Sequence, residues 1–246
     1  MDPVRPPTGA MTVDDPQAGW LKRTYRRLVH DVPFRFVFHL PGVARALSSL
    51  PPDAVVLDLG ANRIEQDQLT GRRVIGLATT PSPLAAVAAD PQTLPIRSGS
   101  LDAVFSRDLF GRLPAPWIAS REVVRILKPG GIACVVVPLH MPARGDDDYY
   151  RFTVRGLRAL FEGLETIGEG VATGPGAFQA VYFVEYGLLY LPTMVQRLAR
   201  LLLTWGLFTY RLVDRLPADP ERIARIAQTV YFVGRKRADA LPDAKA

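Results

Sequence analysis

Several residues that can do chemistry follow one short apolar run. The run Val55–Leu59 is β-branched and apolar apart from Asp58, and Gly60 closes it. Such a pattern is typical of a buried parallel strand that delivers its carboxyl end to a ligand crevice. We therefore expect a ligand site directly after this strand, with the rest of the sheet built around it.

His140 is the candidate general base. It follows the apolar stretch 131–137, so we expect it at the mouth of the same crevice, near Asp148. A neutral imidazole accepts a proton from a hydroxyl group near neutral pH. A histidine that only holds a loop fits the sequence equally well, and both interpretations stay open.

The segment 146–151 offers further candidates. Tyr150 and Arg151 are predicted to hold an anionic acceptor, because a guanidinium suits phosphate or carboxylate. The alternative is an Arg–Asp clamp that fixes the loop. Consecutive carboxylates, as in Asp146–Asp148, converge on one ion only in a tight loop, so we expect no metal site. The single cysteine, Cys134, lies in an apolar stretch and is expected in the core.

Composition limits the classes of protein and partner. The chain has 246 residues, 48% of them hydrophobic, which suits one α/β domain with an appendage. A net charge of +6 favours anionic partners. Basic and aromatic residues are not interleaved, so we expect no nucleic-acid partner and rank a membrane surface above it. One cysteine excludes an internal disulfide and fits a cytoplasmic protein.

The elements that must position these residues alternate along the chain. Apolar runs predict strands, and a helix is predicted between the fourth and fifth of them. Lys128–Gly131 ends that helix, because proline cannot continue it and glycine supplies a reversal. This order predicts an α/β fold with a doubly wound, mostly parallel sheet, and an antiparallel last strand. The predicted strands cover 55–59, 73–77, 86–89, 101–106, 131–137 and 229–236, and the helix covers 116–127.

The remaining regions are predicted from their composition. Residues 1–17 and 238–246 are expected to be disordered tails. Residues 18–50 carry helical periodicity and predict a helical lid, with a membrane-touching basic helix as the alternative. The core is expected to span 51–177 and to resume at 217–237 with a last helix and strand.

The segment 178–216 is predicted to be an apolar helical insert. Its apolar runs are interrupted by Glu185, Arg197 and Arg200, so no uncharged run is long enough to span a bilayer. We expect apolar side chains such as Leu188 and Leu202 to meet a membrane, a second subunit or an apolar acceptor. A peripheral site at the inner face of the membrane and a homodimer both stay open.

The motifs resemble, in order, those of the class I S-adenosylmethionine-dependent methyltransferases. The resemblance covers about two-thirds of the chain, and Glu122–Gly131 is its most specific part. Asp148–Thr153, Asp-Tyr-Tyr-Arg-Phe-Thr, is similar to a branch often found among sugar and cell-envelope biosynthesis genes. The motifs lie at Val56–Gly60, Val74–Leu77, Ala89–Asp90 with Leu94–Ile96, Ser100–Val104 and Arg121–Gly131.

The resemblance implies S-adenosyl-L-methionine as cofactor and assigns residues to it. The glycine-rich turn lets backbone N–H groups approach the cofactor, since a Cβ would collide with it. Asp90 maps onto the residue that binds the adenine amino group. The residue after the second strand, which would bind the ribose hydroxyls, maps onto Ala78. The implied cofactor-binding set is Asp58, Gly60, Asn62, Ala78, Asp90, Leu94 and Ser106.

Three positions depart from the family pattern. Asn62 stands where the glycine-rich turn has glycine, and Ala78 cannot accept a hydrogen bond. Gly111–Arg112 replaces the usual Glu-His pair.

Two functions follow. The first is a methyltransferase, with O-methylation expected, acting on a small-molecule or lipid-linked sugar acceptor. The second is a protein with this fold that does not bind the cofactor and serves as a partner or hosts another ligand or chemistry.

Overall fold

The computed structural model describes most of the core and of the insert. It covers residues 41–61, 72–79, 85–143, 145–206, 214, 216 and 219–238. The predictions for 1–40, for Asn62 and for 239–246 lie outside these residues.

Seven strands form one mixed sheet in the order β3-β2-β1-β4-β5-β7-β6. β1 lies inside the sheet between β2 and β4, and the neighbours from β3 to β5 pair in parallel. β7 pairs antiparallel with β5 and with β6. The predicted fold class is confirmed. The strands are β1 (Val55–Leu59), β2 (Arg73–Ala78), β3 (Val87–Ala88), β4 (Leu101–Arg107), β5 (Leu127–Pro138), β6 (Glu165–Thr173) and β7 (Thr229–Arg235).

Two parts of the sheet differ from the sequence prediction. β5 begins at Leu127 and not at Gly131, because the backbone of 130–131 pairs with Lys236 after β7. The register between β4 and β5 shifts within this stretch, between the pairs at Leu101 and Ala103. β6 was not predicted from the sequence, and it forms the sheet edge next to β7.

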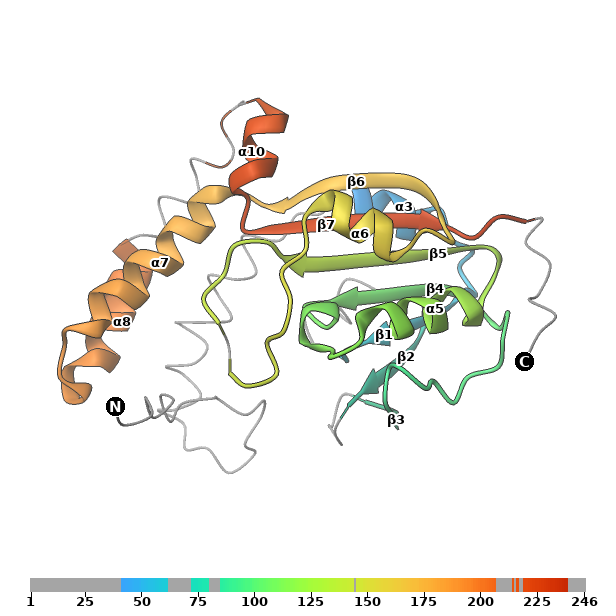
Figure 1. The fold of residues 1–246 in the computed structure, drawn as a ribbon, viewed down its shortest axis with the longest axis horizontal. Coiled ribbons are helices and arrows are strands. Elements are labelled where there is room, and N and C mark those ends of the chain that lie inside the picture. The colour runs from blue at the N-terminus through green and yellow to red at the C-terminus, as the bar shows by residue number, and fades with distance from the viewer. Residues whose placement is uncertain are drawn as a thin grey trace.

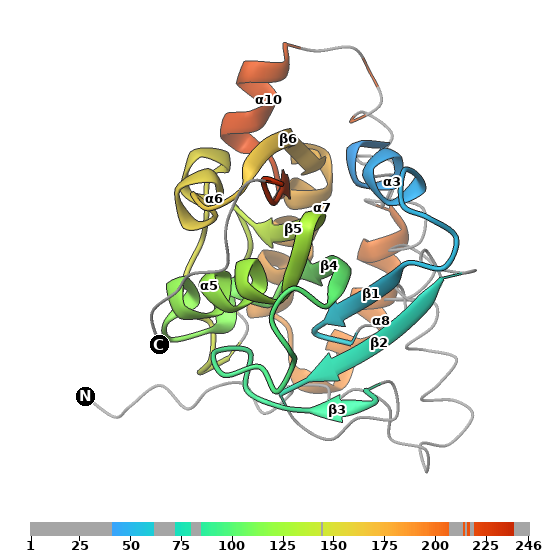
Figure 2. The same ribbon diagram turned by 90° about the vertical axis from the view of Figure 1, so that its right-hand side faces the viewer.

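Helices cover both faces of the sheet (Figure 2). α5 (Pro116–Ile126) and α6 (Val154–Leu160) lie on one face, where Leu57, Val104 and Phe161 belong to the larger apolar cluster. α3 (Pro41–Ser48) lies on the other face, where Val43 and Leu47 join the cluster of Val56 and Phe105. The two faces of the central strands are therefore buried, as their continuous apolar sequences require.

The helix ends follow from local chemistry. α5 begins with Pro116 in its first turn, a position where proline needs no backbone N–H. The Thr153 side chain caps α6 by accepting a hydrogen bond from the Gly156 N–H at 3.0 Å. Asp219 caps α10 (Pro220–Ile226) in the same way through the Glu221 N–H.

The insert forms a helical hairpin. α7 (Pro175–Leu189) and α8 (Thr193–Gly206) leave the sheet at the end where β4 and β5 finish, and they project away from it (Figure 1). The Asp214 carboxylate accepts a hydrogen bond from the Gly176 N–H at 2.7 Å and so fixes the base of the hairpin. Across the described ranges, no helix is both long enough and apolar enough to cross a bilayer.

Candidate functional site

The turn after β1 has the backbone geometry of a ligand-binding turn. Gly60 has φ +122° and Ala61 has φ +42°. The Gly60 N–H donates to the Leu77 carbonyl at 2.8 Å, which ties the turn to the end of β2. An added Cβ at Gly60 would meet its nearest neighbour at 3.6 Å, so the backbone conformation and not lack of space requires glycine.

Polar side chains accompany this turn at the carboxyl ends of β1 and β4. Asp58 is 1% exposed and shares its sheet face with Val56, on the α3 side. Ser106 is fully buried and shares the opposite face with Val104. Within the described part of the chain, the Ser106 Oγ has no hydrogen-bond partner. A buried hydroxyl in that state is expected to serve a ligand or a water molecule.

Ala78 ends β2 beside this turn. It is half-buried, and its carbonyl accepts the Ala89 N–H at 3.0 Å, so its backbone continues the pairing with β3. Its methyl group offers no hydrogen bond to a ligand. The crevice therefore lacks a carboxylate at the end of β2.

Asp90 lies in a tight turn after β3. Its carboxylate accepts the Gln92 N–H at 2.9 Å, and its carbonyl accepts the Thr93 N–H at 3.0 Å. The residue is exposed, so the carboxylate keeps lone pairs that a ligand can reach. Leu94 differs: its side chain is buried in the core, and its N–H donates to the Glu122 carboxylate at 2.9 Å.

Glu122 and Arg125 of α5 clamp the loop that carries Asp90. Arg125 donates to the carbonyls of Leu94 and Ile96 at 3.1 and 2.9 Å, and its Nε bonds Glu122 at 2.7 Å. The hydrogen bond from Arg125, stronger than the opposing effect of burial, holds the pKa of Glu122 below its usual value. Sequence reasoning treated these residues only as part of a motif. Their role in the structure is to position the loop after Asp90.

Two charged residues at the end of β4 were missed from the sequence. Arg107 is 9% exposed, and Asp108 has φ +56°, a conformation that non-glycine residues rarely adopt. The Asp108 N–H donates to the Val136 carbonyl at 2.9 Å, which fixes the turn against β5. The signal was present in the sequence, because adjacent charges directly follow a buried strand that borders the crevice.

Gly111 and Arg112 hold the loop 146–151. The Gly111 carbonyl accepts the N–H groups of Tyr149 and Tyr150 at 2.9 and 2.8 Å, and an added Cβ would lie 2.7 Å from the Tyr150 carbonyl oxygen. The Arg112 Nε donates to Asp147 at 2.8 Å. A glutamate at position 111 would place its Cβ against the Tyr150 carbonyl oxygen, and a histidine at position 112 would remove the guanidinium that bonds Asp147. Gly111 and Arg112, which depart from the family pattern, are therefore the residues that fit against the loop 146–151.

Arg151 forms a clamp with Asp148. Its Nη2 donates to Asp148 at 2.7 Å and to the Met141 carbonyl at 3.2 Å. Hydrogen bonding to Asp148 raises the pKa of Arg151, and the negative charge of Asp108 acts in the same direction. The end of β4 and this loop therefore lie close together at Arg151. The clamp is formed, and binding of an anionic acceptor by Arg151 stays a prediction.

Tyr150 is held in an aromatic group beside this clamp. Its hydroxyl donates to the Pro114 carbonyl at 3.2 Å, and its ring lies edge-on to Trp117 with centroids 6.4 Å apart. Neighbouring Tyr149 is more exposed. Tyr150 thus borders the site with a fixed ring, and its contact with a substrate stays a prediction.

His140 follows β5, as the sequence predicted. Its Nδ1 lies 3.0 Å from the Ala227 carbonyl oxygen, and its backbone N–H donates to the Gln228 carbonyl at 3.1 Å. A carbonyl only accepts, so Nδ1 carries a proton, and in the neutral ring Nε2 is left with the lone pair. The ring is half-buried at the carboxyl end of the sheet.

Comparisons with known proteins agree with this geometry. Residues 42–135 match the family model described as a methyltransferase domain. The crystal structure of the [4+2]-cyclase SpnF superposes with a TM-score of 0.52 at 16% identity, covering 91% of this chain and 84% of that one. Phosphoethanolamine N-methyltransferase 2 of Haemonchus contortus, in complex with S-adenosyl-L-methionine, gives a TM-score of 0.52 at 15% identity. That match covers 80% of this chain and 52% of the longer relative. No curated protein sequence matches the chain.

Residues 42–135 of this chain form a methyltransferase domain. The domain match covers the turn after β1, the end of β2 and the clamped loop, which are the parts that carry the family's motifs. The two structural matches support the fold beyond residue 135. They do not define the acceptor, because both identities are far below the level at which activity is shared.

The residues of this chain fit S-adenosyl-L-methionine at its amino-acid part and its adenine, but not at its ribose. The Gly60 turn lets a ligand approach the backbone without meeting a Cβ, and the buried Ser106 hydroxyl has hydrogen-bonding capacity. The exposed Asp90 carboxylate suits an adenine amino group. Ala78 provides nothing for the ribose hydroxyls. Asn62 lies outside the described residues, so its part in the turn stays a prediction.

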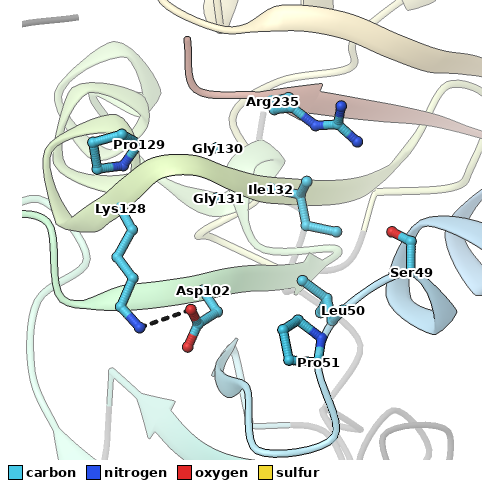
Figure 3. A pocket seen from close by; sticks show the side chains of 10 residues that line it. All are labelled: Ser49, Leu50, Pro51, Asp102, Lys128, Pro129, Gly130, Gly131, Ile132 and Arg235. Carbon is cyan, nitrogen blue, oxygen red and sulfur yellow. Dashed lines mark hydrogen bonds and ion pairs between the residues drawn. The ribbon is translucent and has the colours of Figure 1, made fainter. Parts of the chain in front are cut away.

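A shallow cavity of about 240 Å³ lies at the opposite end of the sheet (Figure 3). It lies beside the amino ends of β4 and β5, where Lys128 and Asp102 form an ion pair at 2.7 Å. Burial acts to raise the pKa of Asp102, but hydrogen bonds from Lys128 and Val55 outweigh it and lower the pKa. Asp102 thus ties β5 to the start of β1. This cavity is remote from the cofactor turn, and its polar groups serve the fold.

Proposed function

We propose that this protein transfers a methyl group from S-adenosyl-L-methionine to a hydroxyl oxygen of a small-molecule or lipid-linked sugar acceptor. The observation that carries the proposal is the hydrogen bond between His140 Nδ1 and the Ala227 carbonyl. It fixes the orientation of an imidazole, a side chain suited to proton transfer, at the carboxyl end of the sheet. An oxygen acceptor needs such a base, whereas an amine or thiolate acceptor does not.

The chain's own residues have separable roles in this reaction. The bound cofactor supplies an electrophilic methyl group on a sulfonium, and the protein supplies alignment. Gly60 and Ser106 hold the amino-acid part, and Asp90 holds the adenine. His140 Nε2 takes the acceptor's hydroxyl proton as the oxygen attacks. Glu122 and Arg125 act as positioning residues, because their side chains bond each other and the loop that carries Asp90.

The acceptor is proposed to enter between the loop 146–151 and the base of the hairpin. The loop 146–151 follows β5 and α7 follows β6, and these two strands run in the same direction, so both segments lie at the carboxyl end of the sheet. Tyr182, Phe183 and Tyr186 are exposed on α7. Polar groups near Arg151 and aromatic surface on α7 suit a molecule with a sugar-like head and an apolar tail. This juxtaposition supports a lipid-linked acceptor over a fully polar metabolite.

Transfer of radioactive methyl from labelled S-adenosyl-L-methionine tests the proposal. The protein is incubated with a total lipid extract and, separately, with an aqueous metabolite extract, and the products are partitioned. We expect label in the lipid fraction as an alkali-stable ether. Label only in the aqueous fraction would reject the lipid-linked acceptor, and an alkali-labile methyl ester would reject a hydroxyl acceptor.

A histidine variant tests the proton acceptor. His140→Asn keeps one hydrogen bond to Ala227 but has no ring nitrogen to accept a proton, so kcat should fall about a hundredfold or more while cofactor affinity stays unchanged. A kcat equal to that of the wild type would remove His140 from the mechanism.

A second function is favoured by one observation, the methyl group of Ala78 at the end of β2. The [4+2]-cyclase SpnF has the same fold, so the fold itself does not fix the reaction. On this alternative the protein does not bind the cofactor and hosts another ligand, chemistry or partner. A titration with S-adenosyl-L-methionine separates the two functions, because only the first requires binding.

A further inference from the structure

The tip of the α7–α8 hairpin, residues 186–196, carries a large exposed apolar surface. Leu189 is 73% exposed, Tyr190 74% and Met194 93%. The neighbouring Tyr186 and Val195 are exposed as well. Leaving side chains of this size in water forfeits about 25 cal/mol per Å² of apolar surface. A protruding cluster of this kind marks an interaction site.

The tip contains no charged residue. The stretch from Tyr186 to Gln196 is uncharged, and charges resume at Glu185 on one side and Arg197 on the other. Glu185 is paired with Arg200 across the two helices, with Oε1 and Nη1 2.5 Å apart. The hairpin therefore has an uncharged apolar end and a charged zone below it.

Several backbone groups of the tip are hydrogen-bonded within it. The Gln196 Nε2 donates to the Leu188 and Leu191 carbonyls at 3.3 and 3.0 Å. The Leu191 N–H donates to the Leu188 carbonyl, and the Val195 N–H to the Pro192 carbonyl. A turn that enters a lipid phase must pair its backbone groups internally, because no water is present there to pair with them. A turn that stays in water has no such requirement.

The dimensions of the uncharged end match a shallow insertion. From Glu185 to Tyr190 the chain advances five residues, or about 7–8 Å at the rise of an α-helix. Monotopic helical elements bury their apolar part about 5–10 Å into the boundary between head groups and acyl chains. The Glu185–Arg200 pair would then lie at the level of the head groups. The rings of Tyr186 and Tyr190, with centroids 5.5 Å apart, would lie at the interface that tyrosine favours.

We propose that the α7–α8 tip inserts into the interface of a lipid bilayer and anchors the protein there. The net positive charge of the hairpin favours a bilayer surface that contains anionic lipids. Within 175–206 the charged residues are Glu185, Arg197 and Arg200, which leaves a net positive charge. The hairpin enters tip-first, since both helices project from the sheet (Figure 1).

Site-specific fluorescence tests the insertion directly. Met194→Cys is labelled with an environment-sensitive dye, and native Cys134 stays unlabelled because it is fully buried with a pKa raised to about 12. The matched control is Ile167→Cys on β6, another exposed apolar position. Vesicles of phosphatidylcholine with phosphatidylglycerol should shift the dye at 194 to the blue and leave the dye at 167 unchanged. Absence of a shift at 194 would overturn the proposal.

Flotation with the same vesicles measures the contribution of the tip. Leu189→Glu should weaken partitioning about ten- to hundredfold, as expected for loss of one buried leucine, and Ile167→Glu should not change it. Circular dichroism confirms that both variants are folded. Equal flotation of wild type and Leu189→Glu would reject tip insertion. A wild-type dimer without vesicle binding, converted to monomer by Leu189→Glu, would assign the tip to a second copy. Neither experiment uses the cofactor, so its result is independent of methyl transfer.

Discussion

Replacing Arg125 by methionine should loosen the loop that carries Asp90. The substitution removes hydrogen bonds of 3.1, 2.9 and 3.0 Å to Leu94, Ile96 and Ser98 and keeps most of the side-chain volume. Each such bond contributes about 1 kcal/mol, since the Arg125 side chain is partly exposed and water replaces part of each contact. The free energy of unfolding should therefore fall by about 2–3 kcal/mol.

Cofactor affinity should fall in the same variant. Asp90 lies four positions before Leu94, the first residue that Arg125 contacts. Without these contacts the loop becomes mobile and no longer holds the Asp90 carboxylate toward the adenine. We expect a Kd for S-adenosyl-L-methionine about tenfold higher, equivalent to about 1.4 kcal/mol. Denaturant unfolding measures the first effect, and calorimetric titration measures the second. Arg121→Met is the matched control, because Arg121 lies on the same helix and bonds only its own helix at the Trp117 carbonyl.

The pH dependence of stability gives a further check on the clamp. The folded-state pKa of Glu122 is lowered from its ordinary value of 4.5, chiefly by the hydrogen bond from Arg125. Its stabilisation is therefore fully present above that value and is lost as the pH falls through the folded pKa. The stability difference between wild type and Arg125→Met should shrink in this acidic range. A variant as stable as Arg121→Met, with unchanged affinity and the same pH profile as wild type, would refute the positioning role.

Three other predictions follow from single side chains. Ala78→Asp should tighten S-adenosyl-L-methionine binding by about 1–3 kcal/mol through a restored charged hydrogen bond, measured by calorimetry with Ala78→Asn as the weaker control; unchanged affinity would mean that the ribose lies elsewhere. Gly111→Ala should lower the free energy of unfolding by about 1–3 kcal/mol, because the added Cβ would lie 2.7 Å from the Tyr150 carbonyl oxygen. Gly163→Ala is the control, since its Cβ would make only ordinary contacts from 3.4 Å. Similar stabilities of the two variants would contradict this. Cys134 should resist thiol reagents in the folded protein and react fully in denaturant, since burial raises its pKa to about 12; modification of the native protein would show that β5 opens.

Much of the fold could be predicted where burial alone determines structure. Val55–Leu59 was predicted as a strand with the observed bounds, because a buried β-branched run has no good alternative. A last helix was predicted within 217–237, and α10 lies there at Pro220–Ile226. β6 was missed because Gly168, Gly170 and its exposed glutamates weaken the strand pattern. It is a strand because β7 offers it an edge.

The hairpin shows a different limit of sequence reasoning. Apolar content predicted buried contact for Leu188 and Leu202 alike, yet Leu188 is buried between the helices while Leu202 is 63% exposed. Leu203 of α8 packs closely against Gly187 of α7, where an added Cβ would lie only 3.3 Å from it. This close contact sets which side of α8 faces α7. Such a contact between helices has no signature in local periodicity.

The site was partly readable from the sequence. Gly60 and Asp90 were located by motif, and the positive φ of Gly60 explains why glycine is needed there. The role of Glu122 and Arg125 could not be predicted, because the backbone groups that their side chains bond lie 28 or more positions earlier in the chain. Arg151 was given two interpretations, and its contacts with Asp148 and Met141 establish the clamp.

Calorimetric titration of the purified protein with S-adenosyl-L-methionine tests whether the turn after β1 binds this cofactor. We expect saturable binding at one site. Gly60→Val should weaken it, because valine cannot adopt the +122° φ of that turn without strain. We also expect competition by S-adenosylhomocysteine, the product of methyl transfer. A folded protein that shows no binding at millimolar cofactor would contradict the account and leave the methyltransferase fold with another ligand.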